Sequence, residues 1–323
     1  MNSRPLGHSD LSIPPVIFGA WAIGGWNWGG TDDGEAIRAI HASIDAGVTA
    51  IDTAPVYGFG HSESVVGRAI ADRRDRVQVL TKVGLRWDTT EGAHFFDSDG
   101  QSVYRNLRPA SIRAEVEASL RRMGIDEIDL IQCHWPDPSF PVEETMAGLA
   151  ALVDEGKVRA VGVSNFDPRL LTRAKIALGE VPLASTQPRY SLLDRKIEAD
   201  VLPWCRQAGV GAIVYSPIEQ GLLSGKVTMD RTFPADDGRS RSPRFAPESR
   251  AGVLAALEQT ADIAAAHNAT PAQIAIAWCF HQPGVTAAIV GARSPQQAIE
   301  NAAAGRITLS AAEIARLSQV FAG

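Results

Sequence analysis

The chain contains 323 residues, of which 45% are hydrophobic and 21% charged, and this is the composition of an ordinary globular protein. A net charge of −6 at pH 7 gives no electrostatic footprint for nucleic acid, and no stretch approaches the roughly 20 apolar residues that a membrane span needs. We interpret Arg239, Arg241 and Arg244, which have Asp236 and Asp237 beside them, as part of a solvated loop.

The first element is a predicted β-hairpin over Arg4–Ile13. A buried strand, Val16–Trp21, follows and leads into a loop rich in Gly and Trp. Asp32 or Asp33 then caps a helix that runs to about Ala46, with apolar residues at helical spacing.

The same alternation of a short apolar strand and a helix continues along the chain. Further strands are predicted at Thr49–Thr53, Val77–Val83, Ile128–Cys133, Arg159–Val163, Ala184–Gln187, Gly211–Tyr215 and Thr286–Val290. Helices are predicted from Ser62 and from Arg108, and over Val142–Glu155, Pro168–Leu178, Ile197–Ala208, Arg250–Ala266, Pro271–His281, Pro295–Ala303 and Ser310–Phe321. The segment from Gly84 to Leu107 is predicted as a long polar loop.

Eight strand–helix units without a linker predict one α/β domain over residues 1–323, a (β/α)8 TIM barrel with an N-terminal β-hairpin and two extra helices. A doubly wound sheet is the alternative. Its dinucleotide fingerprint requires G-x-G-x-x-G directly after the first strand, and the glycine pairs at 24–25 and 29–30 do not keep that spacing. The sequence therefore favours the barrel.

The three cysteines, Cys133, Cys205 and Cys279, match no metal or redox spacing and are interpreted as buried thiols. Unpaired thiols are typical of a reducing compartment, and the first residues lack the apolar core of a signal peptide. We therefore expect a cytoplasmic protein.

Four polar side chains follow the carboxyl ends of neighbouring predicted strands. Asp52 ends the second strand and Tyr57 lies in the turn after it, while Lys82 ends the third strand and His134 follows the fourth. Barrel strands present their carboxyl ends at one mouth, so we expect the four to converge. Taken singly, they have ordinary alternatives: a structural ion pair, a packing tyrosine and a satisfied core histidine.

Together the four side chains suit proton transfer at a carbonyl or alcohol oxygen. A free tyrosine has a pKa of about 10, and we expect the Lys82 ammonium, held by Asp52, to lower the pKa of Tyr57. His134 can donate a hydrogen bond to the same oxygen. The set has no activated nucleophile, and the histidines show no metal-binding spacing. Protonation of a carbonyl without a nucleophile requires hydride from a cofactor.

The sequence resembles the aldo-keto reductase superfamily of NADP-dependent barrels over essentially its whole length. The segments that carry the resemblance are Gly47–Ala54 with Tyr57, Gly58, Ser62 and Glu63; Thr81 and Lys82; Ile128–Leu130 through His134; Gly156–Phe166; Tyr215–Pro217 with Gly221–Lys226; and Gly291–Arg293 with Gln297, Glu300 and Asn301. The stretches His134–Pro138 and Pro141–Thr145 resemble bacterial members.

This resemblance implies an NADP(H)-dependent oxidoreductase that interconverts an aldehyde, ketone or sugar carbonyl and an alcohol. By the resemblance, Tyr57 is the general acid of reduction and the base of oxidation. Asp52 and Lys82 would tune Tyr57, and His134 would position the substrate oxygen.

The resemblance also implies the parts of a cofactor site. The nicotinamide would lie against Tyr215, with its amide held by Ser164, Asn165 and Gln187. The pyrophosphate would lie near Lys226 and against Ser216, Pro217, Ile218 and Gln220. The adenosine end would meet Gly291, Ala292, Gln297, Glu300 and Asn301, with Arg293 or Ser294 on the 2′-phosphate and Arg244 closing over the cofactor.

Aromatic residues are predicted to wall the substrate pocket. The expected set is Trp21, Trp26, Trp87 and Trp135, joined by Trp28, Phe95 and Phe96. Such a wall suits a sugar or an aryl carbonyl, although ordinary packing is the alternative for each single tryptophan. Pro188 stands where many relatives carry asparagine, so one contact on the nicotinamide side is expected to be absent.

Two other functions use the same residues. A Schiff-base aldolase would employ Lys82 as its nucleophile, and an NADPH-binding sensory or regulatory subunit with little turnover would keep all four polar side chains. The sequence does not distinguish the physiological substrate, the favoured direction, NADPH from NADH, or a monomer from a larger assembly.

Overall fold

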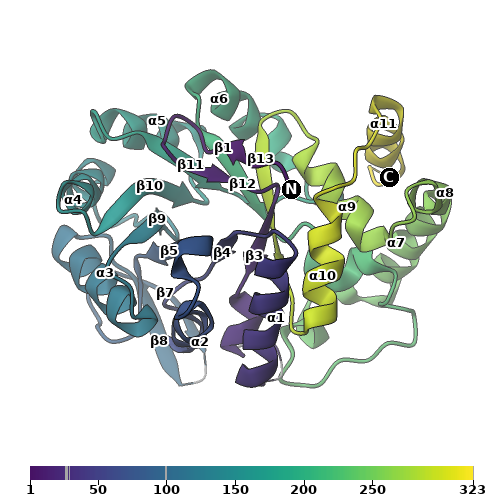
Figure 1. Cartoon of the computed structure of the whole chain (residues 1–323), viewed down its shortest axis with the longest axis horizontal. Helices are drawn as coiled ribbons and strands as arrows, with labels where there is room; N and C mark the ends of the chain where they lie inside the picture. The colour runs from purple at the N-terminus through teal and green to yellow at the C-terminus, as the bar shows by residue number, and fades with distance from the viewer. Residues whose placement is uncertain (26–27, 29, 99, 323) are drawn as a thin grey trace.

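The computed structural model describes residues 1–25, 28, 30–98 and 100–322. In this part of the chain, eight parallel strands close into a barrel surrounded by helices (Figure 1). The barrel strands are β3 (Val16–Gly19), β4 (Ala50–Asp52), β5 (Gln78–Val83), β9 (Ile128–Cys133), β10 (Val158–Ser164), β11 (Leu183–Gln187), β12 (Gly211–Tyr215) and β13 (Val285–Gly291). Each pairs with the next along the chain, and β13 pairs with β3. The predicted (β/α)8 architecture is confirmed.

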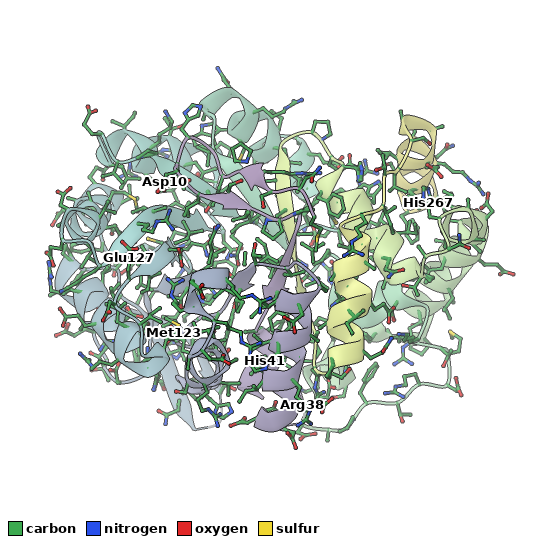
Figure 2. The ribbon with its side chains drawn as sticks, in the orientation of Figure 1. Asp10, Arg38, His41, Met123, Glu127 and His267 are labelled. Carbon is green, nitrogen blue, oxygen red and sulfur yellow. The ribbon has the colours of Figure 1, made fainter. Side chains whose placement is uncertain are left out.

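Helices alternate with the strands as predicted. They are α1 (Asp33–Asp45), α2 (His61–Ile70), α3 (Pro109–Met123), α4 (Val142–Asp154), α5 (Pro168–Ala177), α6 (Val201–Ala208), α7 (Pro247–Gln259), α8 (Ala261–Ala266), α9 (Pro271–Phe280), α10 (Pro295–Ala304) and α11 (Ala311–Val320). Neighbouring helices pack side by side: His41 of α1, labelled in Figure 2, donates from Nε2 to the Ala69 carbonyl of α2 at 2.9 Å. None of the helices in the described residues has the length and apolar composition that a membrane crossing requires.

Local chemistry sets where the helices begin and end. Asp32 caps α1 by accepting from the Glu35 N–H, and Thr270 and Ser310 form capping boxes at α9 and α11. The helix predicted over 250–266 is two helices, because the chain leaves helical geometry at Thr260.

The two ends of the barrel differ in polarity. A hairpin of β1 (Arg4–Pro5) and β2 (Ser12–Ile13) lies at the amino-terminal end, as predicted. Its Leu6, Leu11 and Ile13 are buried and cluster with the barrel side chains Ile17, Ala50, Leu80, Leu130, Ala160, Ala184, Ile213, Ala287 and Ile289. The interior is therefore apolar at this end, and the buried polar residues Asp52, Lys82, Gln132 and Gln187 lie toward the other end of their strands.

The segment from Gly84 to Leu107, predicted as a loop, contains a three-stranded antiparallel sheet. Its strands are β6 (Leu85–Arg86), β7 (Ala93–Ser98) and β8 (Gln101–Arg105), in the order β6-β8-β7. Val103 is fully buried in a small cluster with Val56 and Leu85, against which Phe95 and Phe96 pack. The prediction was wrong because the exposed polar residues of this segment, such as His94, Asp97 and Ser102, alternate with residues that pack inward, such as the buried Val103.

A backbone contact between two loops fixes the position of Tyr57. A Cβ atom added at Gly24 would lie 2.6 Å from the Tyr57 carbonyl carbon, and one at Gly58 would lie 2.2 Å from the Gly24 oxygen. Gly58 also has a positive φ of 66°, which disfavours other residues. The loop after β3 thus lies directly against the loop that carries Tyr57.

We expect Gly24→Ala to lower the free energy of unfolding by about 1–3 kcal/mol, because the added methyl group overlaps backbone atoms that cannot move independently. Gly252→Ala is the matched control, since Gly252 is exposed in α7 with no atom within 4 Å of its added Cβ. That variant should gain roughly 0.5–1 kcal/mol. Urea unfolding measures both, and equal effects would contradict the close contact at Gly24.

Candidate active site

A cavity of about 750 Å³ opens at the carboxyl-terminal ends of the strands. The last residues of six barrel strands line it: Gly19, Asp52, Ser164, Gln187, Tyr215 and Gly291. Parallel barrels collect functional side chains at this end, because every strand delivers its last residue there. The cavity is therefore the candidate active site.

A buried ion pair lies at the floor of the cavity. Lys82 Nζ donates to Asp52 Oδ1 at 2.6 Å and to the Thr53 carbonyl at 2.9 Å. The Lys82 side chain is 1% exposed and the Asp52 side chain 4% exposed. Burial lowers the pKa of Lys82, while the Asp52 charge acts in the opposite direction. The structure thus brings these two residues together as predicted.

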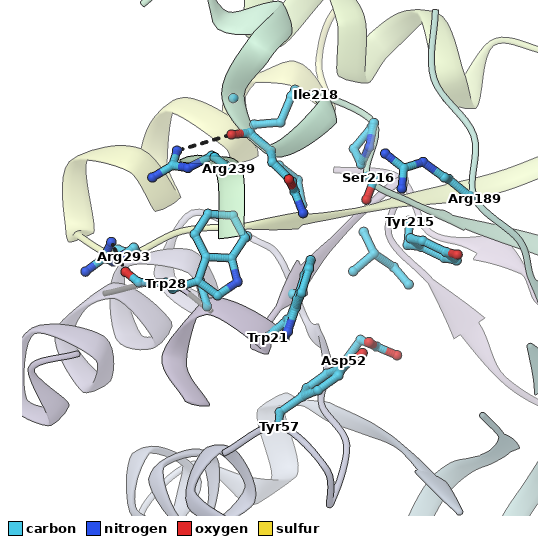
Figure 3. A pocket seen from close by; sticks show the side chains of 18 of the residues that line it. Trp21, Trp28, Asp52, Tyr57, Arg189, Tyr215, Ser216, Ile218, Arg239 and Arg293 are labelled. Carbon is cyan, nitrogen blue, oxygen red and sulfur yellow. Dashed lines mark hydrogen bonds between the residues drawn. The ribbon is translucent and has the colours of Figure 1, made fainter. Parts of the chain in front are cut away.

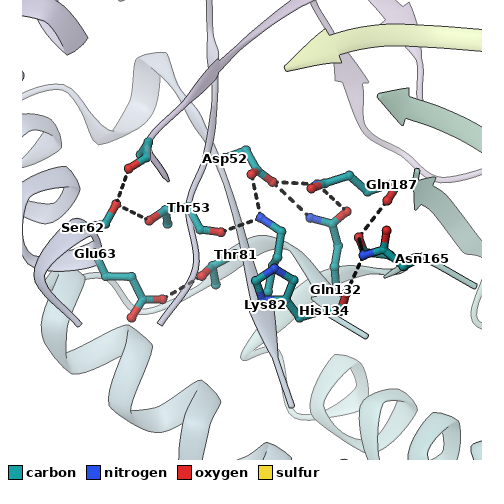
Figure 4. A network of polar contacts seen from close by, with 12 residues as sticks. Asp52, Thr53, Ser62, Glu63, Thr81, Lys82, Gln132, His134, Asn165 and Gln187 are labelled. Atoms are coloured by element: carbon teal, nitrogen blue, oxygen red, sulfur yellow. Dashed lines mark hydrogen bonds and ion pairs between the residues drawn. The ribbon is translucent and has the colours of Figure 1, made fainter. Parts of the chain in front are cut away.

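Two glutamine amides complete the coordination of the Asp52 carboxylate (Figure 4). Gln187 Nε2 donates to Asp52 Oδ2 at 2.8 Å, and Gln132 Nε2 donates to the same oxygen at 3.3 Å. Gln187 Nε2 also donates to Gln132 Oε1 at 3.1 Å. Gln132 was not among the predicted site residues, because a glutamine within an apolar strand matches no functional motif.

Tyr57 lies above the buried cation. Lys82 Nζ is 5.0 Å from the centroid of the Tyr57 ring, within the range of a cation–π contact. Burial, and then the Asp52 charge, raise the pKa of Tyr57 well above 10. We expected Lys82 to lower this pKa, but burial of the phenol and the nearby Asp52 charge both act in the opposite direction. The phenol is therefore protonated at neutral pH.

His134 lies beside Tyr57, with ring centroids 5.7 Å apart and ring planes at 82°. Burial, and then the Lys82 charge, lower the pKa of His134 well below 6.5. The imidazole is therefore neutral near pH 7 and carries one N–H donor. All four predicted proton-handling side chains meet within this part of the site.

The residues predicted to hold the nicotinamide lie on the next strands and bond to one another. Ser164 Oγ donates to the Gln187 carbonyl at 2.7 Å, and Tyr215 Oη donates to Asn165 Oδ1 at 3.1 Å. Asn165 Nδ2 donates to the His134 carbonyl at 3.1 Å, and Asn165 has a positive φ of 62°. This bonding aligns one wall of the cavity with His134.

A strained segment after β12 forms the next part of the lining. Ser216, Pro217, Ile218 and Gln220 all line the cavity, and positive φ values occur at Ser216 (61°) and Gln220 (55°). Non-glycine residues adopt such values at a cost of about 1–3 kcal/mol each, and they cluster at ligand sites. Lys226 also lines the cavity and donates to Glu300 Oε2 at 3.2 Å.

The far end of the cavity lies at the beginning of α10. Gly291, Arg293, Gln297, Glu300 and Asn301, which we expect to meet the adenosine end of a cofactor, line it. The Arg293 guanidinium donates to the Trp28 carbonyl at 3.1 Å and to the Gly30 carbonyl at 3.0 Å. Within the described residues, Ala292 is not part of the lining and is 1% exposed.

Arg239, which we assigned to a solvated loop, is part of the cavity wall (Figure 3). Its guanidinium lies 5.1 Å from the Trp28 ring and 4.4 Å from the Phe233 ring, and it pairs with Asp237 at 2.6 Å. Trp28 and Asp237 also form an isolated antiparallel bridge. This contact joins segments more than 200 residues apart, so the local charge pattern could not predict it.

Arg244, which we expected to close over the cofactor, is not among the described residues that line the cavity. It binds the segment after β12 instead. It donates to Glu219 at 2.8 Å and to Asp194 at 2.9 Å. Arg189, which the sequence analysis missed, lines the cavity and also binds Glu219. Buried Glu219 thus anchors the strained segment after β12 through two arginines. Arg189 lies two residues beyond the end of β11. A charged residue at that position in a barrel is a candidate site residue, and this was the feature of the sequence that could have identified it.

The predicted aromatic wall is present in part. Trp21 and Trp135 line the cavity together with Trp28, Phe95 and Phe96. Trp87 packs on Phe59 at 5.4 Å between ring centroids and is not among the described lining residues. The prediction for Trp26 falls outside the described residues.

Metal-binding chemistry has no candidate in the residues that the structure describes. No group of three or more His, Cys, Asp or Glu side chains is placed to hold an ion there. Cys133, Cys205 and Cys279 are buried and unpaired, and burial raises the pKa of each thiol. They are not reactive nucleophiles.

Comparison with known proteins gives consistent matches over the whole chain. The model of the "Aldo/keto reductase family" matches residues 15–322. Aldo-keto reductase YhdN of Bacillus subtilis (strain 168) is 40% identical over 300 residues, which are 92% of this chain and 86% of that protein. The NADH-specific methylglyoxal reductase of Escherichia coli (strain K12) is 40% identical over 320 residues, 97% of this chain and 96% of that protein. The structure of glycerol dehydrogenase AKR11B4 from Gluconobacter oxydans superposes with a TM-score of 0.88 at 40% identity, covering 99% of this chain and 94% of that one.

The lowered pKa of His134 predicts a pH dependence of stability. The unfolded histidine has a pKa of about 6.5, so below that pH the unfolded chain binds more protons than the folded one. The free energy of unfolding therefore does not depend on His134 protonation above about pH 6.5. Below that pH, proton uptake by the unfolded histidine lowers the free energy of unfolding by up to about 1.4 kcal/mol per pH unit. His134→Asn should lack this slope in urea unfolding measured between about pH 7.5 and pH 5.5. Equal slopes in the two proteins would contradict a neutral buried imidazole.

Proposed function

Because the chain belongs to the aldo/keto reductase family, we propose that it is an NADP(H)-dependent oxidoreductase that interconverts a carbonyl group and an alcohol. One observation carries the proposal: Tyr57, His134 and the buried Lys82–Asp52 pair lie together at one end of the cavity. A nicotinamide cofactor bound in that cavity would supply or accept the hydride.

The proton chemistry follows from the charges at the cavity floor. During reduction, negative charge develops on the substrate oxygen, and Tyr57 donates its phenolic proton to that oxygen. The phenolate that remains is stabilised by Lys82, which lies 5.0 Å from the ring centroid. Asp52 keeps Lys82 charged and in place, and His134 donates its N–H to orient the oxygen. Oxidation of an alcohol uses the same groups in reverse.

The residues that line the rest of the cavity fit an extended dinucleotide. Ser164, Asn165, Gln187 and Tyr215 would hold the nicotinamide close to His134. The segment from Ser216 to Gln220, with Lys226, would face the pyrophosphate. Arg293, with Ser294 capping the beginning of α10, would meet the 2′-phosphate, because a helix N-terminus and a guanidinium both favour phosphate. This last contact is the basis for proposing NADP(H), although one relative is described as NADH-specific.

The substrate side of the cavity favours an uncharged carbonyl compound such as a sugar or a small aldehyde. The described lining residues on this side are Trp21, Val56, Tyr57, Leu85, Phe95, Phe96, His134 and Trp135. None of these side chains is a carboxylate, an ammonium or a guanidinium, whereas Lys226, Arg293 and Glu300 line the part of the cavity proposed for the cofactor. Burying a substrate charge against an apolar wall would be costly.

A cytoplasmic location is also part of the proposed function.

The Schiff-base alternative is disfavoured by the position of Lys82. Its amine donates to Asp52 and to the Thr53 carbonyl, and Lys82 is not among the described residues that line the cavity. The sensory-subunit alternative would gain support if NADPH bound tightly while a broad panel of carbonyl substrates gave no turnover.

We expect Tyr57→Phe to reduce turnover by about 10²–10⁴-fold, the usual contribution of a general acid, with the dissociation constant for NADPH unchanged within about twofold. NADPH oxidation measured by absorbance and cofactor binding measured by calorimetry test this. Tyr104→Phe is the matched control, because Tyr104 lies in β8 outside the cavity lining. Wild-type turnover in Tyr57→Phe would remove Tyr57 from the proposed role.

Arg293→Ala should weaken NADPH binding at least about tenfold more than NADH binding, because a charge-assisted contact to the 2′-phosphate is lost. The comparison must be a ratio, since Arg293 also donates to the Trp28 and Gly30 carbonyls and this loss affects both cofactors. Arg306→Ala, at an exposed arginine just beyond α10, should change neither affinity. An equal loss for NADPH and NADH would place the 2′-phosphate elsewhere.

A further inference from the structure

Gln132 lies inside the barrel in a position that the fold has made room for. It is fully buried on β9, in register with Lys82 on β5 and with Gly162 on β10. A Cβ atom at position 162 would lie 3.1 Å from Gln132 Cγ and 2.4 Å from Ser185 Oγ. The missing side chain of Gly162 therefore leaves the space that the Gln132 side chain occupies.

The Asp52 carboxylate determines how the amide of Gln132 is oriented. Asp52 Oδ1 accepts from Lys82 Nζ at 2.6 Å, and Oδ2 of the same carboxylate is an acceptor of hydrogen bonds. Gln132 must therefore present Nε2 to Oδ2, at 3.3 Å. A flipped amide would place its oxygen against the carboxylate, and Gln132 Oε1 is consequently fixed on the other side.

The orientation of Gln132 in turn fixes that of Gln187. Gln187 Nε2 donates one hydrogen to Asp52 Oδ2 at 2.8 Å and the other to Gln132 Oε1 at 3.1 Å. Both hydrogens of this amide are then used, and a flip would direct its oxygen at two acceptors. Gln187 lines the cavity, so its side-chain oxygen, Oε1, is the group left to accept from a ligand. The carboxamide of a nicotinamide ring carries the matching N–H donor.

We propose that Gln132 is a positioning residue. It holds the Gln187 amide in the orientation in which Gln187 Oε1 accepts a hydrogen bond from the nicotinamide carboxamide. Because Gln132 also donates to Asp52, the orientation of Gln187 depends on the Asp52–Lys82 pair. The inference rests on the proposed function, because it requires a nicotinamide cofactor in the cavity. Gln132 is not among the described lining residues and acts only through Gln187 and Asp52.

The first test compares ligands with and without the nicotinamide ring. Calorimetric titrations use NADPH and NADH, each paired with its ring-free fragment, 2′-phospho-ADP-ribose or ADP-ribose. Gln132→Leu frees the Gln187 amide to rotate, and we expect about fivefold to tenfold weaker binding of both reduced cofactors. Binding of both fragments should stay within about twofold of wild type, since they do not reach Gln187.

The second test uses a variant whose hydrogen-bonding pattern depends on pH. A protonated glutamate at position 132 can donate to Asp52 and accept from Gln187 as the amide does, whereas an ionised one repels the nearby carboxylate. Relative to wild type at the same pH, Gln132→Glu should bind NADH weakly near pH 9 and recover toward wild type near pH 6. A purely structural role would give no such recovery.

Gln78→Leu is the matched control, because Gln78 is at the amino-terminal end of β5 and donates to the Ser12 carbonyl at 2.8 Å. It should leave all four affinities unchanged. Equal weakening of cofactors and fragments in Gln132→Leu, or a Gln132→Glu variant that stays weak at every pH, overturns the inference while the proposed function stands. A wild-type protein that binds the fragments but gains nothing from the ring, or binds none of the four ligands, overturns both.

Discussion

The buried pair of Asp52 and Lys82 is the constraint on which the site depends. Removing two charges from water costs several kcal/mol per ion, and the cost is recovered only where every donor and acceptor has a partner. Lys82 donates to Asp52 and to the Thr53 carbonyl and lies 5.0 Å from the Tyr57 ring centroid, and Asp52 accepts from Lys82, Gln132 and Gln187. The fold must therefore hold four strands in a fixed register, and that register also sets the positions of Tyr57 and His134.

The barrel supports this arrangement by separating its apolar and polar ends. The N-terminal hairpin fills one end with Leu6, Leu11 and Ile13, so hydrophobic burial there stabilises the cylinder without polar side chains. The opposite end can then hold a polar network that contributes little net stability of its own. This division explains why strands such as β4 and β12 read as apolar runs that finish on a polar residue, Asp52 or Tyr215.

The sequence was sufficient for the architecture and for the convergence of Asp52, Tyr57, Lys82 and His134, because both depend on local patterns: apolar strands, helix caps and polar residues at strand ends. It was insufficient where partners are distant in the chain. Arg239 meets Trp28 only after the loops following β3 and β12 cross, and Gln132 has a role only beside Asp52 and Gln187. The sheet over residues 85–105 was missed because its polar residues resemble those of a loop until its pairing is known. The expected effect of Lys82 on the Tyr57 pKa was wrong, since burial of the phenol and the charge of Asp52 both raise that pKa.

The tryptophans of the aromatic wall also give the protein an intrinsic fluorescence that depends on what the cavity holds. Trp21, Trp28 and Trp135 line the cavity, and the Trp21 ring lies 6.4 Å from that of Tyr57. Indole emission overlaps the absorption band of a reduced nicotinamide. An excited tryptophan would therefore transfer energy to a reduced nicotinamide bound in the cavity, and the tryptophan emission would lose intensity. Intrinsic fluorescence should therefore follow both occupancy and redox state of the cavity in real time, without any attached label.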